Sequence, residues 1–248
     1  TRRAQSKPGE LGLIVDIGGG TSDFSVFRGA GTQVEVLASH GIRLGGTDFD
    51  QEISVAHVMP LLGMGGQLRR TFGDGLLPVP TVIYRELATW AKIPFLYSRD
   101  TERSVEDLLK HAVEPEKISR LRDVITDQLG HELAFAVEHG KIAANGQDRR
   151  SAIDLGLIER DLSAPITNGS LNAALAGFAT RLRAAMYETL ILAGVTPDQI
   201  GAVILVGGSS LMALVRAEVQ TVCPTAEIQQ ADAFTAVVDG LALATGTV

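Results

Sequence analysis

The feature that most constrains this chain is the stretch at residues 13–24, Leu-Ile-Val-Asp-Ile-Gly-Gly-Gly-Thr-Ser-Asp-Phe. An apolar run ends in Asp16, three glycines follow, and a second run with strand-like alternation begins at Thr21. Three adjacent glycines let the main chain approach a bulky anion, because no Cβ stands in the way. Successive amides in such a turn can form an anion-binding concavity. The stretch therefore predicts a β-hairpin whose turn binds a phosphate group.

Two aspartates flank the glycine turn, Asp16 before it and Asp23 after it. Carboxylates beside a phosphate can hold a metal ion or its bound waters. Alternation along the second strand places Thr21 and Asp23 on one face, so both can point into the same site. The alternative is a glycine-rich hairpin that only reverses the chain. The flanking aspartates and the threonine favour the phosphate site.

Composition sets broad limits on the function. The 248 residues suffice for one large domain or two small ones, and 45% of them are apolar. A net charge of −7 argues against a nucleic-acid surface. The single cysteine, Cys223, permits no disulfide framework and predicts a reducing, cytoplasmic setting. No apolar run reaches membrane-spanning length, so we expect no membrane partner.

The order of the expected elements predicts an α/β fold. A meander of three strands is followed by a mostly helical segment and then by alternating strands and helices. This order predicts an α/β core formed by residues 1–47 and 162–248, with an inserted, mostly helical subdomain at 48–161. The expected strands are 11–17, 21–28, 33–39, 151–158, 201–206 (buried on both faces) and 226–229. The expected helices are 48–58, 81–91 (short pieces within an irregular stretch at 61–103), 104–112, 115–144, 168–192, a helix from 210 and 232–245.

A second candidate site follows the apolar strand at 201–206. Gly207 and Gly208 come directly after it, and a helix is expected to begin near Ser210. A strand, a glycine turn and a helix start can bind a phosphate or a nucleoside, because the backbone comes close and the helix offers free amides. The alternative is that the two glycines only pack helix against strand. The turn is neither a Walker A loop nor a dinucleotide fingerprint, since the lysine and the third glycine are absent.

Glu138 and Lys141 form a third candidate. They stand three residues apart on the expected helix at 115–144 and therefore share a face. The alternative is a surface ion pair. The histidines show no metal-binding spacing, and no nucleophile elbow is evident.

Together these motifs resemble the nucleotide-binding domain of DnaK-type heat-shock chaperones, within the actin and sugar-kinase ATPase superfamily. The resemblance implies an actin-like ATPase (ribonuclease H-like) lobe. Two further segments are similar to a bacterial branch, the YegD-like group. The matching segments are Asp16–Phe24, Leu44–Asp50, Glu138–Lys141 and Val203–Ser210 for the family, with Met59–Gly66 and Glu114–Lys117 for the branch.

The resemblance implies that the ligands are ATP or ADP with Mg²⁺. Catalysis would rest on water positioning and charge stabilisation. By the same resemblance Asp16 and Thr21 are the catalytic residues, and Asp16 and Asp23 contact the metal through water. The implied nucleotide-binding residues are Gly18, Gly19, Gly20, Thr21, Gly46, Glu138, Lys141, Gly207, Gly208, Ser209, Leu211 and Asp232.

Two departures from the family pattern matter. These residues hold one aspartate-glycine hairpin, so the chain resembles the second lobe alone. We therefore expect weak nucleotide binding and negligible hydrolysis without the first lobe, which is the main expected partner beside co-chaperone or client proteins. The arginines that grip adenine in the family are replaced here by Ile142 and Leu211. An aliphatic clamp lacks the cation–π contribution of roughly 0.5–2 kcal/mol.

Two other functions stay open at the level of sequence. One is a lobe of a small-molecule kinase of the same superfamily, although no motif for a substrate pocket or a catalytic base is evident. The other is a non-catalytic interaction module that keeps the fold without turnover.

Overall fold

The computed structural model describes residues 9–30, 33–146 and 151–230, and it shows a mixed α/β protein. The chain divides into two compact units, Thr1–Gly46 with Ala176–Val248, and Thr47–Leu175. The first boundary lies next to the predicted one, whereas the second lies within α6 (Asn168–Ala193), beyond the predicted position at 161. Among the described helices, none combines the length and apolar character needed to cross a membrane. The helix expected at 232–245 lies outside the described residues.

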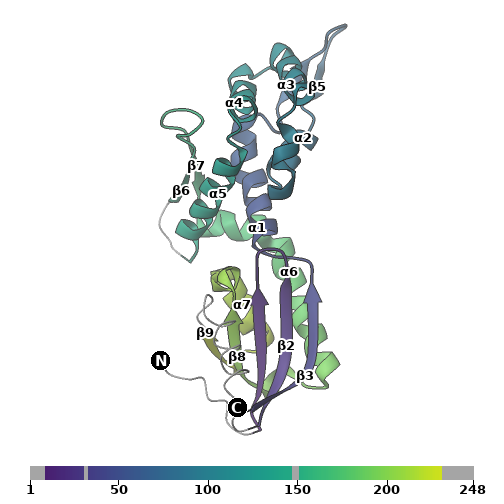
Figure 1. The fold of residues 1–248 in the computed structure, drawn as a ribbon, viewed down its shortest axis with the longest axis vertical. Coiled ribbons are helices and arrows are strands. Elements are labelled where there is room, and N and C mark those ends of the chain that lie inside the picture. The colour runs from purple at the N-terminus through teal and green to yellow at the C-terminus, as the bar shows by residue number, and fades with distance from the viewer. Residues whose placement is uncertain (1–8, 31–32, 147–150, 231–248) are drawn as a thin grey trace, which may run out of the picture. The chain divides into compact units, whose positions relative to one another are not determined.

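The first unit is built on a five-stranded mixed sheet in the order β3-β2-β1-β8-β9 (Figure 1). The three strands of the predicted meander are confirmed as consecutive antiparallel neighbours. The two later strands run parallel to the first, as β8 pairs with β1 and β9 pairs with β8. The bounds are β1 (Leu11–Ile17), β2 (Ser22–Ala30), β3 (Gln33–Ile42), β8 (Ile200–Val206) and β9 (Glu227–Gln230).

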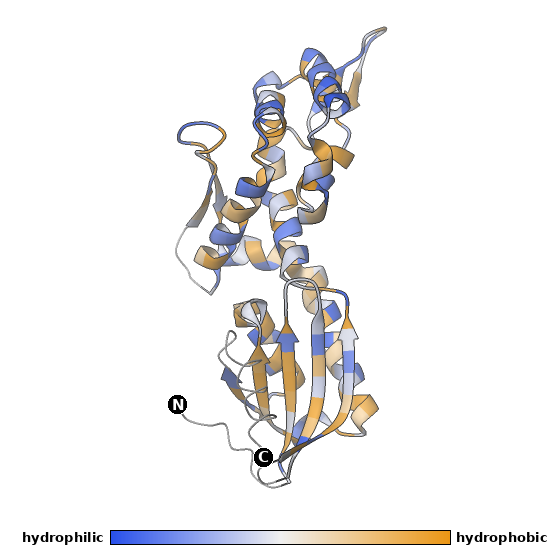
Figure 2. Cartoon of the chain, in the orientation of Figure 1, coloured by the Kyte–Doolittle hydropathy of each residue, from blue (hydrophilic) through white to orange (hydrophobic). Residues whose placement is uncertain are grey.

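One face of this sheet carries the core. Alternate residues such as Leu13, Val15 and Phe24 are completely or almost completely buried, and the strands are accordingly rich in apolar residues (Figure 2). Helices α6 and α7 (Ala213–Val222) lie on one side of the sheet (Figure 1). The prediction that β8 is buried on both faces is wrong. Gly201 is exposed, and from Ala202 onward the residues alternate between half-buried and buried, because the second face is only partly covered.

The second unit consists of short helices and two small hairpins. The helical elements pack around side chains such as Phe49, Tyr84 and Leu121, which are fully buried. The predicted irregular stretch contains a hairpin that the sequence did not reveal, since three-residue strands are too short to show alternation. The elements are α1 (Gly46–Ile53), η1 (Ser54–Val58), η2 (Met59–Leu62), β4 (Gln67–Arg69), β5 (Leu76–Pro78), α2 (Val82–Leu87), η3 (Trp90–Leu96), α3 (Arg99–His111), α4 (Pro115–Thr126), α5 (Gly130–Ala144), β6 (Ser151–Asp154) and β7 (Ser163–Ile166).

The prediction of one long helix over 115–144 is wrong. The chain leaves the helix after Thr126 and starts α5 at Gly130, with Gln128 in the left-handed region at φ 57°. The Tyr97 hydroxyl donates a hydrogen bond to the Gln128 carbonyl and accepts one from the Gly130 amide, each at 3.0 Å. The break is therefore fixed by a tertiary contact, while the apolar spacing on either side stays helical.

Candidate functional site

Three connections of the first unit meet at one edge of its sheet. Because β2 is antiparallel to β1 and β8 is parallel to it, the ends of β1, β3 and β8 and the start of β2 lie at this edge. The connections are the turn at 18–21, the segment at 43–46 and the segment at 207–211, which includes η5 (Gly208–Leu211). The structure thus brings together the two glycine motifs that were singled out in the sequence.

Glycines Gly19 and Gly20 at the tip of the β1–β2 turn are exposed, and neither has positive φ. A Cβ built on either residue would have no heavy atom within 4 Å. The same holds for Gly208 in the neighbouring connection. Neither the backbone conformation nor the packing of the folded chain therefore requires glycine at these three positions.

A different reason explains Gly45, Gly46 and Gly207, which are packed against neighbouring backbone or side chains. A Cβ on Gly45 would lie 2.5 Å from the Gly20 amide nitrogen, and one on Gly46 would collide with the Ser209 hydroxyl. The Gly46 amide also donates a hydrogen bond of 2.9 Å to the Gly18 carbonyl. These glycines let the connections approach one another closely.

Gly207, which directly follows β8, is also closely packed, against the end of β1. It has φ 83°, and a Cβ there would lie 2.8 Å from the Ile17 carbonyl carbon and 2.9 Å from Asp16 Oδ1. Within the following turn, the buried Ser210 hydroxyl donates a 2.7 Å hydrogen bond back to the Gly207 carbonyl. The second glycine motif is therefore held directly beside the end of β1.

Asp16 and Asp23 are direct cross-strand partners in the β1–β2 ladder. Side chains of such a pair share one face of the sheet. Burial raises the pKa of Asp16, and the negative charge of Asp23 raises it further. The Thr21 hydroxyl donates a 3.2 Å hydrogen bond to Asp23 Oδ2, so Thr21 belongs to the same group. A cation at this position would relieve the repulsion between the two carboxylates.

The donor set at this edge suits a hard cation only in part. Among the described residues, no group of three or more histidine, cysteine, aspartate or glutamate side chains is placed to hold a metal ion. Two carboxylates with a nearby hydroxyl are the kind of set that binds Mg²⁺ together with waters and phosphate oxygens. The residues therefore fit a metal that arrives with a phosphate.

Ser22 is a further residue of the site that sequence reasoning did not single out. Its side chain is completely buried, and its hydroxyl donates a 2.7 Å hydrogen bond to the Leu44 carbonyl. This bond ties the start of β2 to the connection at 43–46. A lone serine in an alternating strand gives no signal of such a partner 22 residues away.

In the second unit, Lys141 is buried on α5 and its Nζ lies 2.8 Å from Asp50 Oδ1 on α1. Burial raises the pKa of Asp50, Lys141 opposes this rise, and the charge of Glu138 adds to it. The alternative of a surface pair between Glu138 and Lys141 is therefore wrong, because Lys141 points inward to Asp50.

The remaining predicted nucleotide contacts fall in several places. Leu211 is exposed in the first unit and Ile142 is exposed in the second, where Glu138 also lies. Asp232 lies outside the described residues. No protein-family model matches the chain.

Proposed function

We propose that the first unit is the nucleotide-binding lobe of a DnaK-like chaperone ATPase of the actin and sugar-kinase superfamily. An antiparallel meander continued by parallel strands is consistent with the ribonuclease H-like sheet expected of such a lobe. The proposed ligand is ATP or ADP with Mg²⁺. The single observation that carries the proposal is the open space beside Gly19, Gly20 and Gly208, which the folded chain does not use.

The phosphate groups are proposed to lie against the turn at 18–21. Backbone amides can approach a phosphate closely only where no side chain intervenes. A Cβ at Gly19 or Gly20 would enter that space, although it would touch nothing in the chain itself. An anion of phosphate size accounts for two glycines that the fold does not demand.

The proposed roles of the carboxylates follow from their position. Asp16 and Asp23 would hold Mg²⁺, directly or through its waters, and the ion would neutralise charge on the phosphates. The raised pKa of Asp16 reflects a site where negative charge is unfavourable without such a cation. Asp16 and Thr21 would orient water near the terminal phosphate, each as a hydrogen-bond acceptor, because the Thr21 hydroxyl donates its proton to Asp23.

The rest of the nucleotide is proposed to extend along the 207–211 segment. Gly208 leaves room for it, and Leu211 offers an exposed aliphatic surface for the base. Turnover would require a second phosphate-binding lobe on the opposite side of the triphosphate. Such a lobe is the proposed partner of this one.

Isothermal titration with MgATP and MgADP tests the proposal. We expect weak binding, with Kd on the order of 0.1–1 mM, without hydrolysis. Asp23→Asn should weaken it about tenfold, because a charged ligand of the cation is lost. The matched control is Asp198→Asn, an exposed carboxylate just before β8 at the far end of that strand, which should bind like the wild type. Absence of binding at millimolar MgATP, or equal loss in both variants, would contradict the proposal.

A further inference from the structure

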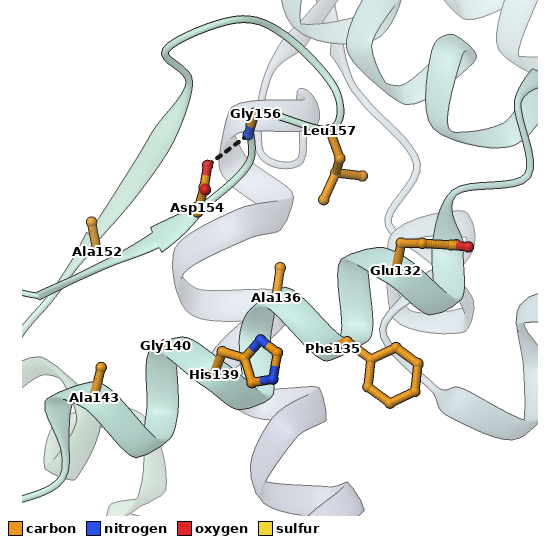
Figure 3. Close-up of a pocket in the computed structure, with 10 residues that line it drawn as sticks. All are labelled: Glu132, Phe135, Ala136, His139, Gly140, Ala143, Ala152, Asp154, Gly156 and Leu157. Atoms are coloured by element: carbon orange, nitrogen blue, oxygen red, sulfur yellow. Dashed lines mark hydrogen bonds between the residues drawn. The ribbon is translucent and has the colours of Figure 1, made fainter.

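Two features of the second unit have no part in the nucleotide site. The first is the β4–β5 hairpin with its tip, residues 67–78, which we call the finger. The second is a groove of about 510 Å³ between α5 and the β6–β7 hairpin (Figure 3). Its lining residues are Glu132, Phe135, Ala136, His139, Gly140, Ala143, Ala152, Asp154, Gly156 and Leu157.

The finger presents apolar side chains to solvent on a fixed support. Every residue from 69 to 78 is exposed, and Phe72 at the tip is 88% exposed. A two-stranded hairpin alone is marginally stable in water. The base of this one is held by α3 and the residues after it, because Arg69 Nη1 donates a 2.6 Å hydrogen bond to the Ala112 carbonyl. The Val113 amide likewise donates to the Gln67 carbonyl at 2.9 Å.

The groove has the size and lining of a binding site. Its volume lies within the range of sites that bind small apolar groups. Ala136 and Leu157 point toward each other across it (Figure 3). Gly140 lets α5 approach β6, since a Cβ there would lie 2.5 Å from Ile153 Cγ1. Most of the residues that line the groove are apolar or small.

An aromatic pair gives this groove a firm edge. Phe135 is 51% exposed, and its ring packs edge-on against Trp90 with the centroids 5.3 Å apart. Trp90 also packs edge-on against His131. Such rings lose little conformational freedom on binding and are typical of interface anchors.

Finger and groove carry complementary charges. The finger holds two arginines, Arg69 and Arg70, against one aspartate, Asp74. The groove lining holds two carboxylates, Glu132 and Asp154, and neither lysine nor arginine. Arg69 is bonded to the Ala112 carbonyl at the base of the finger, so the cation near the aromatic tip is Arg70, two residues before Phe72. This tip matches an apolar groove that is lined by carboxylates.

We propose that the finger of one copy of this chain binds in the groove of a second copy. Phe72 would enter the groove beside Phe135 and Leu157, and Arg70 would approach Glu132. The finger and the β6–β7 hairpin stand at opposite ends of the unit (Figure 1), so a copy does not fill its own groove. The contact is head-to-tail, and it builds chains or rings of copies. The interface is small, and the association is accordingly weak and concentration-dependent.

Analytical ultracentrifugation of the whole chain, from micromolar to near-millimolar concentration, tests this association. We expect the average mass of the wild type to rise with concentration. Arg70→Ser with Phe72→Ser in the finger should weaken the association at least about tenfold, and so should Glu132→Lys with Leu157→Arg in the groove. The matched control is Phe95→Ser, because Phe95 is also a highly exposed phenylalanine of the second unit, and its loss should change nothing.

A mixture of the two double variants gives the sharpest result. Each pair then has one intact finger and one intact groove, so the mixture should form heterodimers and no larger species. Thermal melts of each variant establish that it is folded. A wild type that stays monomeric throughout would overturn the proposal. Finger variants that associate like the wild type, or an equal loss in Phe95→Ser, would overturn it as well.

Discussion

Asp16 and Asp23 face each other as direct partners across the β1–β2 ladder, one residue pair before the turn at 18–21 begins. Like charges in that relation destabilise an antiparallel sheet. The pKa of Asp16 is raised, first by burial and then by the charge of Asp23, which is consistent with this unfavourable interaction between the two carboxylates. A sheet that keeps two opposed carboxylates at an edge with unfilled space fits a site that receives a cation.

Asp16→Asn should make the ligand-free chain more stable at neutral pH. The folded-state pKa of Asp16 is raised, so ionised Asp16 opposes folding and its protonation favours it. The gain should be a few tenths of a kcal/mol to about 1 kcal/mol at pH 7. It should vanish as the pH falls through the folded and then the unfolded pKa. Denaturant melts from neutral to acidic pH measure it, and a loss of stability at pH 7 would contradict the account.

Gly19→Ala should separate stability from ligand binding. Because Gly19 has no positive φ and open space at its Cβ position, alanine should leave stability unchanged or raise it by about 0.4–1 kcal/mol. Binding of MgATP should nevertheless fall, since the methyl group occupies the proposed phosphate position. The matched control is Gly45→Ala, which should destabilise the fold by about 1–3 kcal/mol through its clash with Gly20. Unchanged nucleotide binding in a folded Gly19→Ala chain would count against the phosphate site.

Lys141→Met should destabilise the second unit by about 3 kcal/mol at neutral pH, because Asp50 would be left charged and poorly solvated. Losing Lys141 raises the pKa of Asp50 further, so the cost should shrink as the pH falls and Asp50 binds a proton. The double variant Asp50→Asn with Lys141→Met should recover most of the loss. Lys92→Met, which breaks an exposed pair with Glu86, should change stability by less than about 1 kcal/mol. Equal losses of stability in Lys141→Met and Lys92→Met would show that the buried pair contributes no more to stability than the exposed one.

Gln128→Gly should stabilise the chain by about 1 kcal/mol, since glycine adopts the left-handed conformation without the cost that Gln128 bears at φ 57°. Its side chain accounts for none of the hydrogen bonds at the break, which use the Gln128 backbone and Tyr97. Tyr97→Phe should lower stability at the same break by about 1 kcal/mol. Chemical denaturation measures both, and a loss of stability in Gln128→Gly would show that the side chain matters.

The first unit was largely predictable, because the patterns that specify its first three strands involve residues close together in the sequence. Apolar alternation in β1, β2 and β3 and the glycine turn between them predict the meander. The helix expected over 168–192 is confirmed as α6, which ends at Ala193 before Gly194 with φ 67°. Antiparallel neighbours then place Asp16 opposite Asp23 without any knowledge of the rest.

What could not be predicted depends on contacts between distant residues. The hydrogen bonds of Tyr97 decide where α4 ends, and the partner of Lys141 is Asp50, 91 positions earlier in the sequence. No sequence pattern predicts the buried hydrogen bond from the Ser22 hydroxyl to the Leu44 carbonyl either. Spacing showed that glycines gather at residues 18–20 and 207–208. Only the packing separates those that the fold requires from those that it does not.

We expect the open edge beside Gly19, Gly20 and Gly208 to receive the phosphates of a nucleotide. Backbone-amide NMR of the whole chain during titration with MgATP tests it most directly. A phosphate site at this edge should give saturable shifts at residues 18–21 and 207–209, reproduced by Mg²⁺-pyrophosphate and absent in Gly19→Ala. Shifts confined to other regions, or none at millimolar ligand, would contradict it.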